Sequence, residues 1–127
     1  MANAVTKTVR VYAEAGVTPE HQQLTVNYDT PSNWLKICDA VSAKDQIKVI
    51  GLFGSEGTES ASVWGEGDSG DSSVTSANEI TAPEFPGGGG VAVSGGVLFA
   101  VSKGKSLFFK SDTATQKFTV HVRGAAV

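Results

Sequence analysis

The sequence predicts a mainly β fold: an antiparallel β-sandwich or small barrel of about seven to eight strands, with one short helix and one long loop. Three observations favour it. The chain has 127 residues, the length of one domain, so we expect a single domain over 1–127. Short runs of β-branched residues alternate with polar ones. Gly-rich or polar turns separate such runs every 8–12 residues or so in the last third of the chain.

Two strands are expected first. Residues 5–13 are rich in β-branched side chains and alternate apolar with polar positions, as a half-buried strand does. Residues 15–20 include a glycine and a proline and predict a turn. Residues 24–28 alternate again, which predicts a second strand with Leu24, Val26 and Tyr28 on one face.

A short helix is expected over about residues 31–41. Asp29 or Thr30 can cap its N-terminus, and Pro31 suits the first helical position, where the backbone N–H needs no partner. Apolar residues recur at helical spacing and form one stripe: Trp34, Leu35, Cys38 and Val41. The helix would pack across a sheet, with Trp34 in the core and Cys38, the only cysteine, as an inert core thiol.

The second half of the chain predicts strands around a long loop. Residues 47–53 predict a strand buried over most of its surface, and 60–65 a shorter strand with Trp64 half-buried near its end. Residues 66–90 are rich in Gly, Ser and Asp and end in four glycines, which predicts a flexible loop or arm. The last third predicts an antiparallel meander of four short strands: 91–93, 97–101, 106–109 and 118–122.

Composition excludes several classes of protein. No apolar run approaches the roughly 20 residues that span a bilayer, and the start of the sequence lacks the basic and apolar stretches of a secretory signal. A net charge of −3 and the lack of a basic and aromatic stripe argue against nucleic acid and membrane partners. With one cysteine and two histidines, neither an internal disulfide nor a zinc site is expected, and no cofactor is predicted.

The charges are unevenly distributed. Residues 49–101 hold seven acidic side chains and no basic one, whereas residues 102–127 hold five basic side chains against a single aspartate. They could be ordinary solubilising charges. Alternatively, the acidic loop of one subunit meets the basic strands of the next, which favours rings or lattices whose assembly weakens at high salt.

Two motifs in the loop could carry chemistry. Gly67-Asp68-Ser69-Gly70 resembles the surroundings of the nucleophile in chymotrypsin-like serine proteases, but the next residue is Asp71 where that family has glycine. Neither His21 nor His121 has family-like surroundings for a general base, so the sequence predicts no enzyme. The carboxylates of 66–72 could also form a calcium loop, although they lack the ligand spacing of an EF-hand.

In size, composition and layout the chain resembles the small accessory proteins of tailed-phage virions, namely capsid decoration or cement proteins and tail components. The segment 107–123 resembles a closing hairpin of such proteins. The resemblance implies a structural protein of the virion, trimeric or otherwise homo-oligomeric, that binds capsid or other virion proteins through its N-terminal segment and the 66–90 arm. The candidate contact residues are Trp64, Glu66, Asp68, Asp71, Phe85, Lys103, Lys105 and Arg123.

A binding module is the alternative function. A β-sandwich of this size could hold a carbohydrate or a peptide on exposed aromatic rings, because such rings combine a large apolar face with a polar edge. The candidates for that role are Trp64, Tyr12 and Tyr28.

Overall fold

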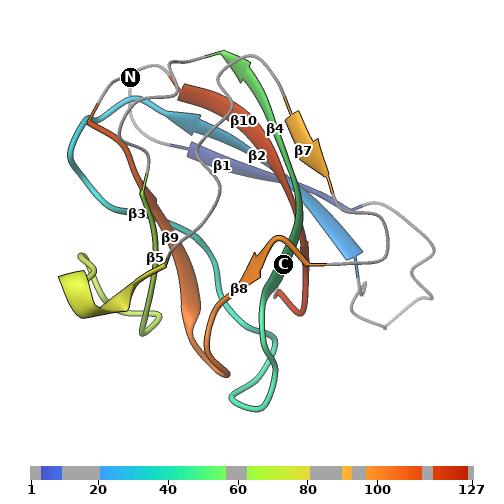
Figure 1. The fold of residues 1–127 in the computed structure, drawn as a ribbon, viewed down its shortest axis with the longest axis vertical. Coiled ribbons are helices and arrows are strands. Elements are labelled where there is room, and N and C mark those ends of the chain that lie inside the picture. The colour runs from blue at the N-terminus through green and yellow to red at the C-terminus, as the bar shows by residue number, and fades with distance from the viewer. Residues whose placement is uncertain are drawn as a thin grey trace.

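The computed structural model of the chain describes residues 4–9, 21–56, 63–80, 90–92, 97–112 and 116–125. Over these ranges the protein consists of two antiparallel β-sheets and one short 3₁₀ turn, η1 (Ser76–Asn78). Figure 1 shows the sheets as two layers. The mainly β, antiparallel fold class predicted from the sequence is therefore confirmed.

The larger sheet has six strands and the smaller has four. In the larger sheet the order is β1 (Ala4–Val9), β2 (His21–Tyr28), β10 (Gln116–Arg123), β4 (Lys48–Glu56) and β7 (Gly90–Ala92), with β8 (Phe99–Ala100) also paired to β4. In the smaller sheet the order is β3 (Leu35–Cys38), β9 (Ser106–Lys110), β5 (Val63–Gly67) and β6 (Glu79–Ile80).

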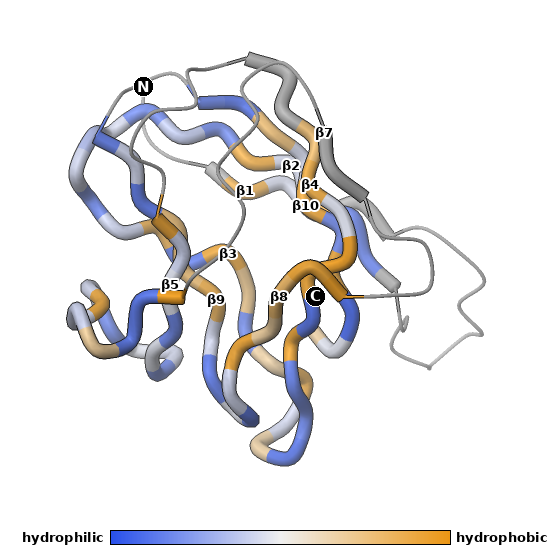
Figure 2. The backbone as a smooth tube through the Cα atoms, viewed as in Figure 1, coloured by the Kyte–Doolittle hydropathy of each residue, from blue (hydrophilic) through white to orange (hydrophobic). Residues whose placement is uncertain are grey.

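The core lies between the sheets and is built from buried apolar residues of both. Burial alternates along β2 and β10, as their sequences predict, with Val26 and Val120 among the residues that point inward. The smaller sheet contributes Ile37, Trp64 and Phe109 to the same cluster. Figure 2 shows hydrophobic stretches in the strands of both layers and hydrophilic residues in the loops between them.

The helix expected over 31–41 is wrong: residues 35–38 form strand β3, which pairs with β9. Ser32 has a left-handed φ of 67°, which a right-handed helix cannot contain, and its N–H donates to the carbonyl of Ser111 at 2.7 Å. The chain is thus turned and tied to the end of β9 before it enters β3. Cys38 is 2% exposed, so its prediction as a core thiol is confirmed, although it lies on a strand.

The meander expected in the last third is also wrong. The strands β7, β8 and β10 pair with β4 or β2 in the larger sheet, whereas β9 pairs with β3 and β5 in the smaller one. The turn predicted over 102–105 is confirmed at 103–104, whereas the turns predicted over 94–96 and 110–117 lie wholly or partly outside the described residues. The chain passes from the larger sheet to the smaller between β8 and β9 and returns between β9 and β10. The composition of a turn does not reveal which strand the next strand will pair with.

The predicted places of the two tryptophans are exchanged. Trp64 is 1% exposed at the centre of the core, with its ring centroid 5.0 Å from that of Phe109 and 5.8 Å from that of Phe118. Trp34 is half-buried in the turn before β3, beneath the ammonium group of Lys110 at 4.8 Å. Losing the helix removes the element that would have covered Trp34.

The loop predicted as a free arm is anchored in its first part. Glu66 and Gly67 belong to β5, and the chain returns through η1 to pair Ile80 with Trp64. A Cβ placed on Gly65 would touch Val74 and Trp34, so the returning chain covers the outer face of the smaller sheet. Over 66–80 the arm is therefore a flap packed on its own domain.

Several predictions lie outside the described residues. These are the end of the first expected strand and the turn after it (10–20), the start of the strand expected over 60–65 (60–62), the rest of the arm (81–89) and the end of the strand expected over 91–93 with the turn after it (93–96); Tyr12 and Phe85 are among them. Within the described part of the chain, no helix has the length and apolar character that crossing a bilayer requires.

Candidate functional site

The acidic candidates of the 66–71 loop are bonded within their own chain. The carboxylate of Asp68 pairs with the ammonium group of Lys105 at 2.8 Å, and this hydrogen bond and charge raise the pKa of Lys105 above its ordinary value. Asp71 accepts from the backbone N–H of Asp68 at 2.9 Å, and Glu66 accepts from that of Ser102 at 3.1 Å. One acidic and one basic candidate residue thus pair within the chain, and a contact between the acidic loop and another subunit stays a prediction.

A second polar cluster fastens the same loop to β3 and β9. The hydroxyl of the buried Ser106 donates to Asp39 at 2.6 Å, and Lys36 donates at 3.2 Å both to Asp39 and to the side chain of Ser69. Burial raises the pKa of Asp39, but hydrogen bonds from Ser106, Ser69 and Lys36 outweigh it and hold this pKa below the ordinary 3.8. The cluster is a bridge between loop and sheet.

The cluster lacks the parts of a nucleophilic site. Ser69 is exposed, and the ring of His121 packs against Phe53 on the larger sheet, on the other layer of the fold. Lys36 donates to the hydroxyl of Ser69 at 3.2 Å, so in this arrangement it does not accept the proton that a general base would take from that hydroxyl. The described residues therefore contain no activated serine at this position.

The geometry of the carboxylates in this loop does not support the interpretation that it binds calcium. Asp68 and Asp71 are occupied by Lys105 and by a backbone N–H, which compete for the oxygens that a cation would need. Throughout the described ranges, no group of three or more His, Cys, Asp or Glu side chains is placed to hold a metal ion.

Replacing Asp39 with asparagine should destabilise the fold near neutral pH and matter less as the pH falls. A carboxylate with a lowered folded-state pKa adds stability above its unfolded-state value and loses it as the pH falls through the folded-state value. Because this side chain is 39% exposed, solvent screens the effect to about 1 kcal/mol or less at neutral pH. Urea unfolding of the wild-type protein and of Asp39→Asn, from neutral pH into the acid range, measures this difference in stability.

Asp112→Asn is the matched control for this experiment. Asp112 is exposed just after β9, and no described donor hydrogen-bonds its carboxylate. Its replacement should cost less stability at neutral pH than that of Asp39, because it removes the same charge and breaks no hydrogen bond among the described residues. If Asp39→Asn lowers the free energy of unfolding by the same amount at every pH, the substitution disturbs packing and the charge of Asp39 does not contribute to stability.

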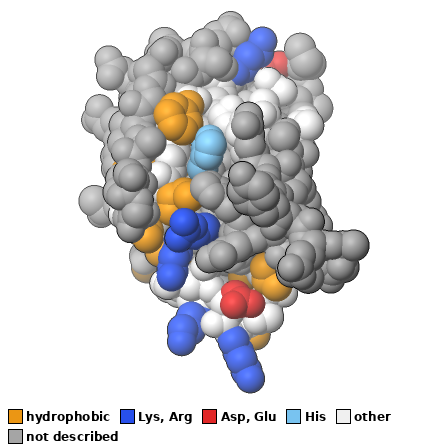
Figure 3. Space-filling view, turned by 90° about the vertical axis from the view of Figure 1, so that its right-hand side faces the viewer, with side chains coloured by type: hydrophobic (Ala, Val, Ile, Leu, Met, Phe, Trp, Pro, Cys, Tyr) orange, Lys and Arg blue, Asp and Glu red, His pale blue; other side chains and the backbone are white. Residues whose placement is uncertain are grey.

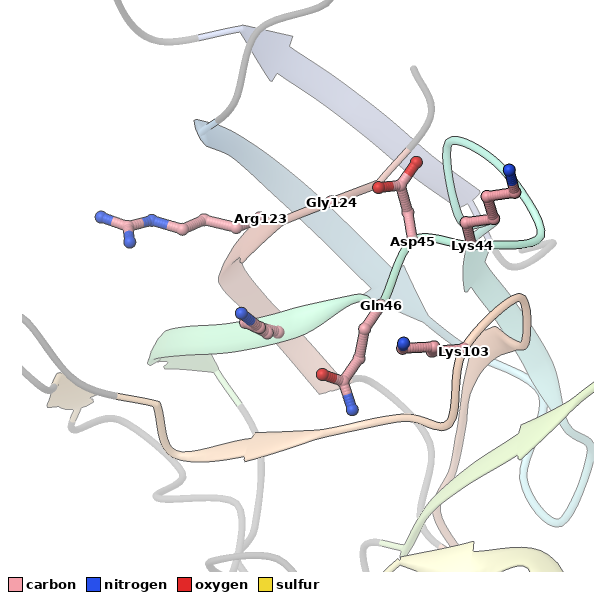
Figure 4. Close-up of a pocket in the computed structure, with 7 residues that line it drawn as sticks. Lys44, Asp45, Gln46, Lys103, Arg123 and Gly124 are labelled. Carbon is pink, nitrogen blue, oxygen red and sulfur yellow. The ribbon is translucent and has the colours of Figure 1, made fainter.

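A hollow lined mainly by basic side chains opens where the β3–β4 loop, the β8–β9 turn and the end of β10 meet (Figure 4). Its volume is about 400 Å³, and it is open to solvent. Lys and Arg side chains gather towards the lower end of the face drawn in Figure 3. The lining residues are Lys44, Asp45, Gln46, Lys48, Lys103, Arg123 and Gly124.

The end of β10 is locked against the loop that precedes β4. The carbonyl of Gly124 accepts from the N–H of Val41 at 3.1 Å. Gly124 has a φ of +75°, and a Cβ at this position would collide with the carbonyl oxygen of Gln46. Glycine is therefore required here for the two segments to approach closely enough to form one wall of the hollow.

The β8–β9 turn is fixed to the same loop and forms the other wall. The N–H of Gly104 donates to the carbonyl of Asp45 at 2.9 Å, and the N–H of Val101 donates to that of Ile47 at 3.1 Å. This turn presents Lys103 to the hollow, while Lys105 reaches the acidic loop. The turn that carries Lys103 and the loop that carries Lys44 are thus hydrogen-bonded to each other through their backbones.

The charges in the hollow are not balanced. Lys48 and Arg123 lie directly opposite each other on β4 and β10, an arrangement of like charges that destabilises a sheet. The carboxylate of Asp45 accepts from the hydroxyl of Ser42 at 2.8 Å and so caps its own turn. No described carboxylate forms an ion pair with any of the four basic side chains. Chemically, the hollow is suited to bind anions.

The structure divides the predicted contact residues among four places. Lys103 and Arg123 meet at the hollow, and Glu66, Asp68, Asp71 and Lys105 meet at the anchored loop. Trp64 is in the core, so its prediction as a surface contact is wrong, and Phe85 lies outside the described residues. Tyr28, proposed for ligand stacking, is also buried, with its hydroxyl donating to the carbonyl of Ser111 at 2.9 Å.

Sequence reasoning missed the part of the hollow that comes from the first half of the chain. Lys44, Gln46 and Lys48 stand in a segment whose charges balance when counted along the sequence. The only local signal was a polar run before a buried strand, which is typical of any loop. The basic character arises from the pairing of β4 with β10, which brings Lys48 next to Arg123.

Comparisons of the chain with protein-family models, with curated proteins and with solved structures found no match.

Proposed function

We propose that the chain is a non-enzymatic structural protein of a virus particle, a capsid decoration protein held on the shell by protein–protein contacts. The observation that supports this proposal best is the basic hollow. It combines exposed, uncompensated charge with a wall of fixed backbone, as a docking surface does. The polar clusters elsewhere in the described ranges bridge elements of the chain itself.

In this function each contact is small and the number of contacts supplies the strength. A decoration protein occupies many equivalent positions, and a trimer engages several shell subunits at once. Linked contacts raise the overall affinity far above that of one contact, by a factor of about 10²–10⁴.

A carbohydrate-binding function receives less support. Two of the three aromatic residues considered for it, Trp64 and Tyr28, are 1% exposed and hold the two sheets together. The half-buried Trp34 presents its ring to Lys110. The described surface therefore offers no platform built from the residues that suggested this function.

The proposal is tested on particles. Virus particles released from cells that express the chain should carry it in copy numbers comparable to the shell protein, measured by quantitative mass spectrometry after density-gradient purification. Washing in high salt should release it, because screening weakens contacts between exposed charges. Light scattering of the washed-off protein should then give the mass of a trimer or another discrete oligomer.

Enrichment in the particle-free fraction, with only trace amounts on gradient-purified particles, would contradict the proposal. A matched wash with a neutral osmolyte controls for shell rupture, since an osmolyte does not screen charge.

A further inference from the structure

We propose that the basic hollow is the docking site for an acidic segment of a partner protein, whose carboxylates neutralise the side chains of Lys44, Lys48, Lys103 and Arg123. This deepens the proposed function by naming the chemistry of the contact. It rests on that function only for the identity of the protein that carries the acidic segment.

The first argument is the charge that the fold leaves unneutralised. The register of β4 and β10 places Lys48 opposite Arg123, and the nearby Asp45 is engaged by Ser42. Like charges held side by side repel, and a bound anion relieves that repulsion, since the hollow holds four basic side chains against the single carboxylate of Asp45.

The second argument is the pre-organisation of the backbone. The three segments that carry the basic side chains are joined by the hydrogen bonds of Val41, Gly104 and Val101. Gly104 and Gly124, both with φ of +75°, allow the segments to approach one another. An anion that binds here has little backbone to order, which lowers the entropic cost of association.

The lining favours carboxylates on a protein over other anions. The hollow is open and has no aromatic or aliphatic wall, unlike the enclosed and mainly apolar pockets that hold small organic ligands. No aromatic side chain lines it for the bases of a nucleic acid to stack on.

An apolar residue at the rim points to the same kind of partner. Val41 is 44% exposed, and its N–H is bonded to Gly124, a lining residue of the hollow. Interfaces between proteins commonly combine an apolar contact with charged groups around it. A partner segment with acidic residues next to an aliphatic one matches this arrangement.

The test measures binding of a fluorescently labelled hexaglutamate peptide to the full chain by anisotropy at low salt. The double variant Lys48→Gln/Arg123→Gln should bind at least about tenfold more weakly, since each exposed charge contributes modestly and two are removed. Lys117→Gln is the matched control: Lys117 is an exposed lysine at the other end of β10. It should change the affinity by less than about twofold, the effect of net charge alone.

A second measurement separates docking from folding. In the absence of peptide, the double variant should be as stable as the wild type or slightly more so, because a repulsive pair has been removed. Peptide should raise the melting temperature of the wild-type protein and leave that of the double variant unchanged. A variant that melts much earlier than the wild type would show that the two basic residues serve the fold and would overturn the proposal.

Two competing anions identify the ligand class. Tripolyphosphate or a short DNA duplex should bind more weakly than the peptide at equal ionic strength and should not depend on Lys48 and Arg123. Tighter binding of either one at the hollow would overturn the proposal, as would equal loss of peptide binding in Lys117→Gln.

The particle experiment distinguishes this inference from the proposed function. If the chain is on particles and the double variant occupies them equally well, the hollow is not the docking site, although the proposed function stands. If the peptide binds as described but the chain is missing from particles, the hollow takes an acidic partner elsewhere and the virion function fails.

Discussion

Replacing Trp64 with alanine is expected to lower the free energy of unfolding by about 3–5 kcal/mol, the usual cost of removing a large buried aromatic side chain. The indole is 1% exposed and contacts rings from both sheets, including Phe99, Phe109 and Phe118. Its loss would leave a cavity at the point where the two layers meet. Urea unfolding followed by circular dichroism measures the change.

Two further variants make this prediction specific. Trp34→Ala should cost much less, because Trp34 is only half-buried and loses mainly a contact with Lys110 worth about 0.5–1 kcal/mol. Trp64→Phe should also cost less than Trp64→Ala, since no described acceptor satisfies the buried indole N–H that it removes. Equal losses for Trp34→Ala and Trp64→Ala would show that Trp64 is not the central core residue.

The second large effect is expected at a glycine. Gly124→Ala forces a left-handed φ of +75° on a residue with a side chain, at about 1–2 kcal/mol. The new methyl group also meets the carbonyl of Gln46, and such overpacking adds about 1–3 kcal/mol. Thermal and urea unfolding should both show the loss, and peptide binding at the hollow should weaken because its wall moves.

Gly70→Ala is the control for this substitution. Gly70 lies in the exposed turn after β5, and a Cβ there would meet no atom within 4 Å. Its replacement should be neutral or slightly stabilising, because alanine restricts the unfolded chain. If Gly70→Ala and Gly124→Ala cost the same, the effect of Gly124 does not come from its close approach to Gln46.

Where the sequence alternates cleanly, it predicted the fold. Over 24–28 in β2 and 118–122 in β10 every second residue is apolar, and the structure buries Leu24, Val26, Phe118 and Val120 as expected. The segment around Leu35 failed because an apolar run of this length fits a helix and a strand equally well. Hydrogen bonds between distant parts of the chain, such as that from Ser32 to Ser111, favour the strand over the helix. No local sequence pattern contains this information.

The candidate site was less predictable than the fold. Individual basic residues such as Lys103 and Arg123 could be named, but their neighbours could not, since Lys48 joins them only through the register of β4 and β10. The acidic residues were expected to contact basic residues of another subunit. Asp68 pairs with Lys105 of its own chain, because the loop folds back on its own sheet. The sequence shows which residues are charged. Strand pairing decides which of them share a surface, and therefore the net sign of that surface.

The exchange of strands between the two layers has a consequence for how the protein folds. The strand β10 lies between β2 and β4, and Gln22 of β2 donates to the carbonyl of Ala125, 103 positions further along the chain. Contacts of such sequence separation form slowly, on a timescale of about milliseconds to seconds. The larger sheet has a gap at its centre until β10 has been synthesised. During synthesis β2 and β4 therefore present unpaired edges until β10 is available to pair with them. At this stage we expect the chain to be most prone to aggregate.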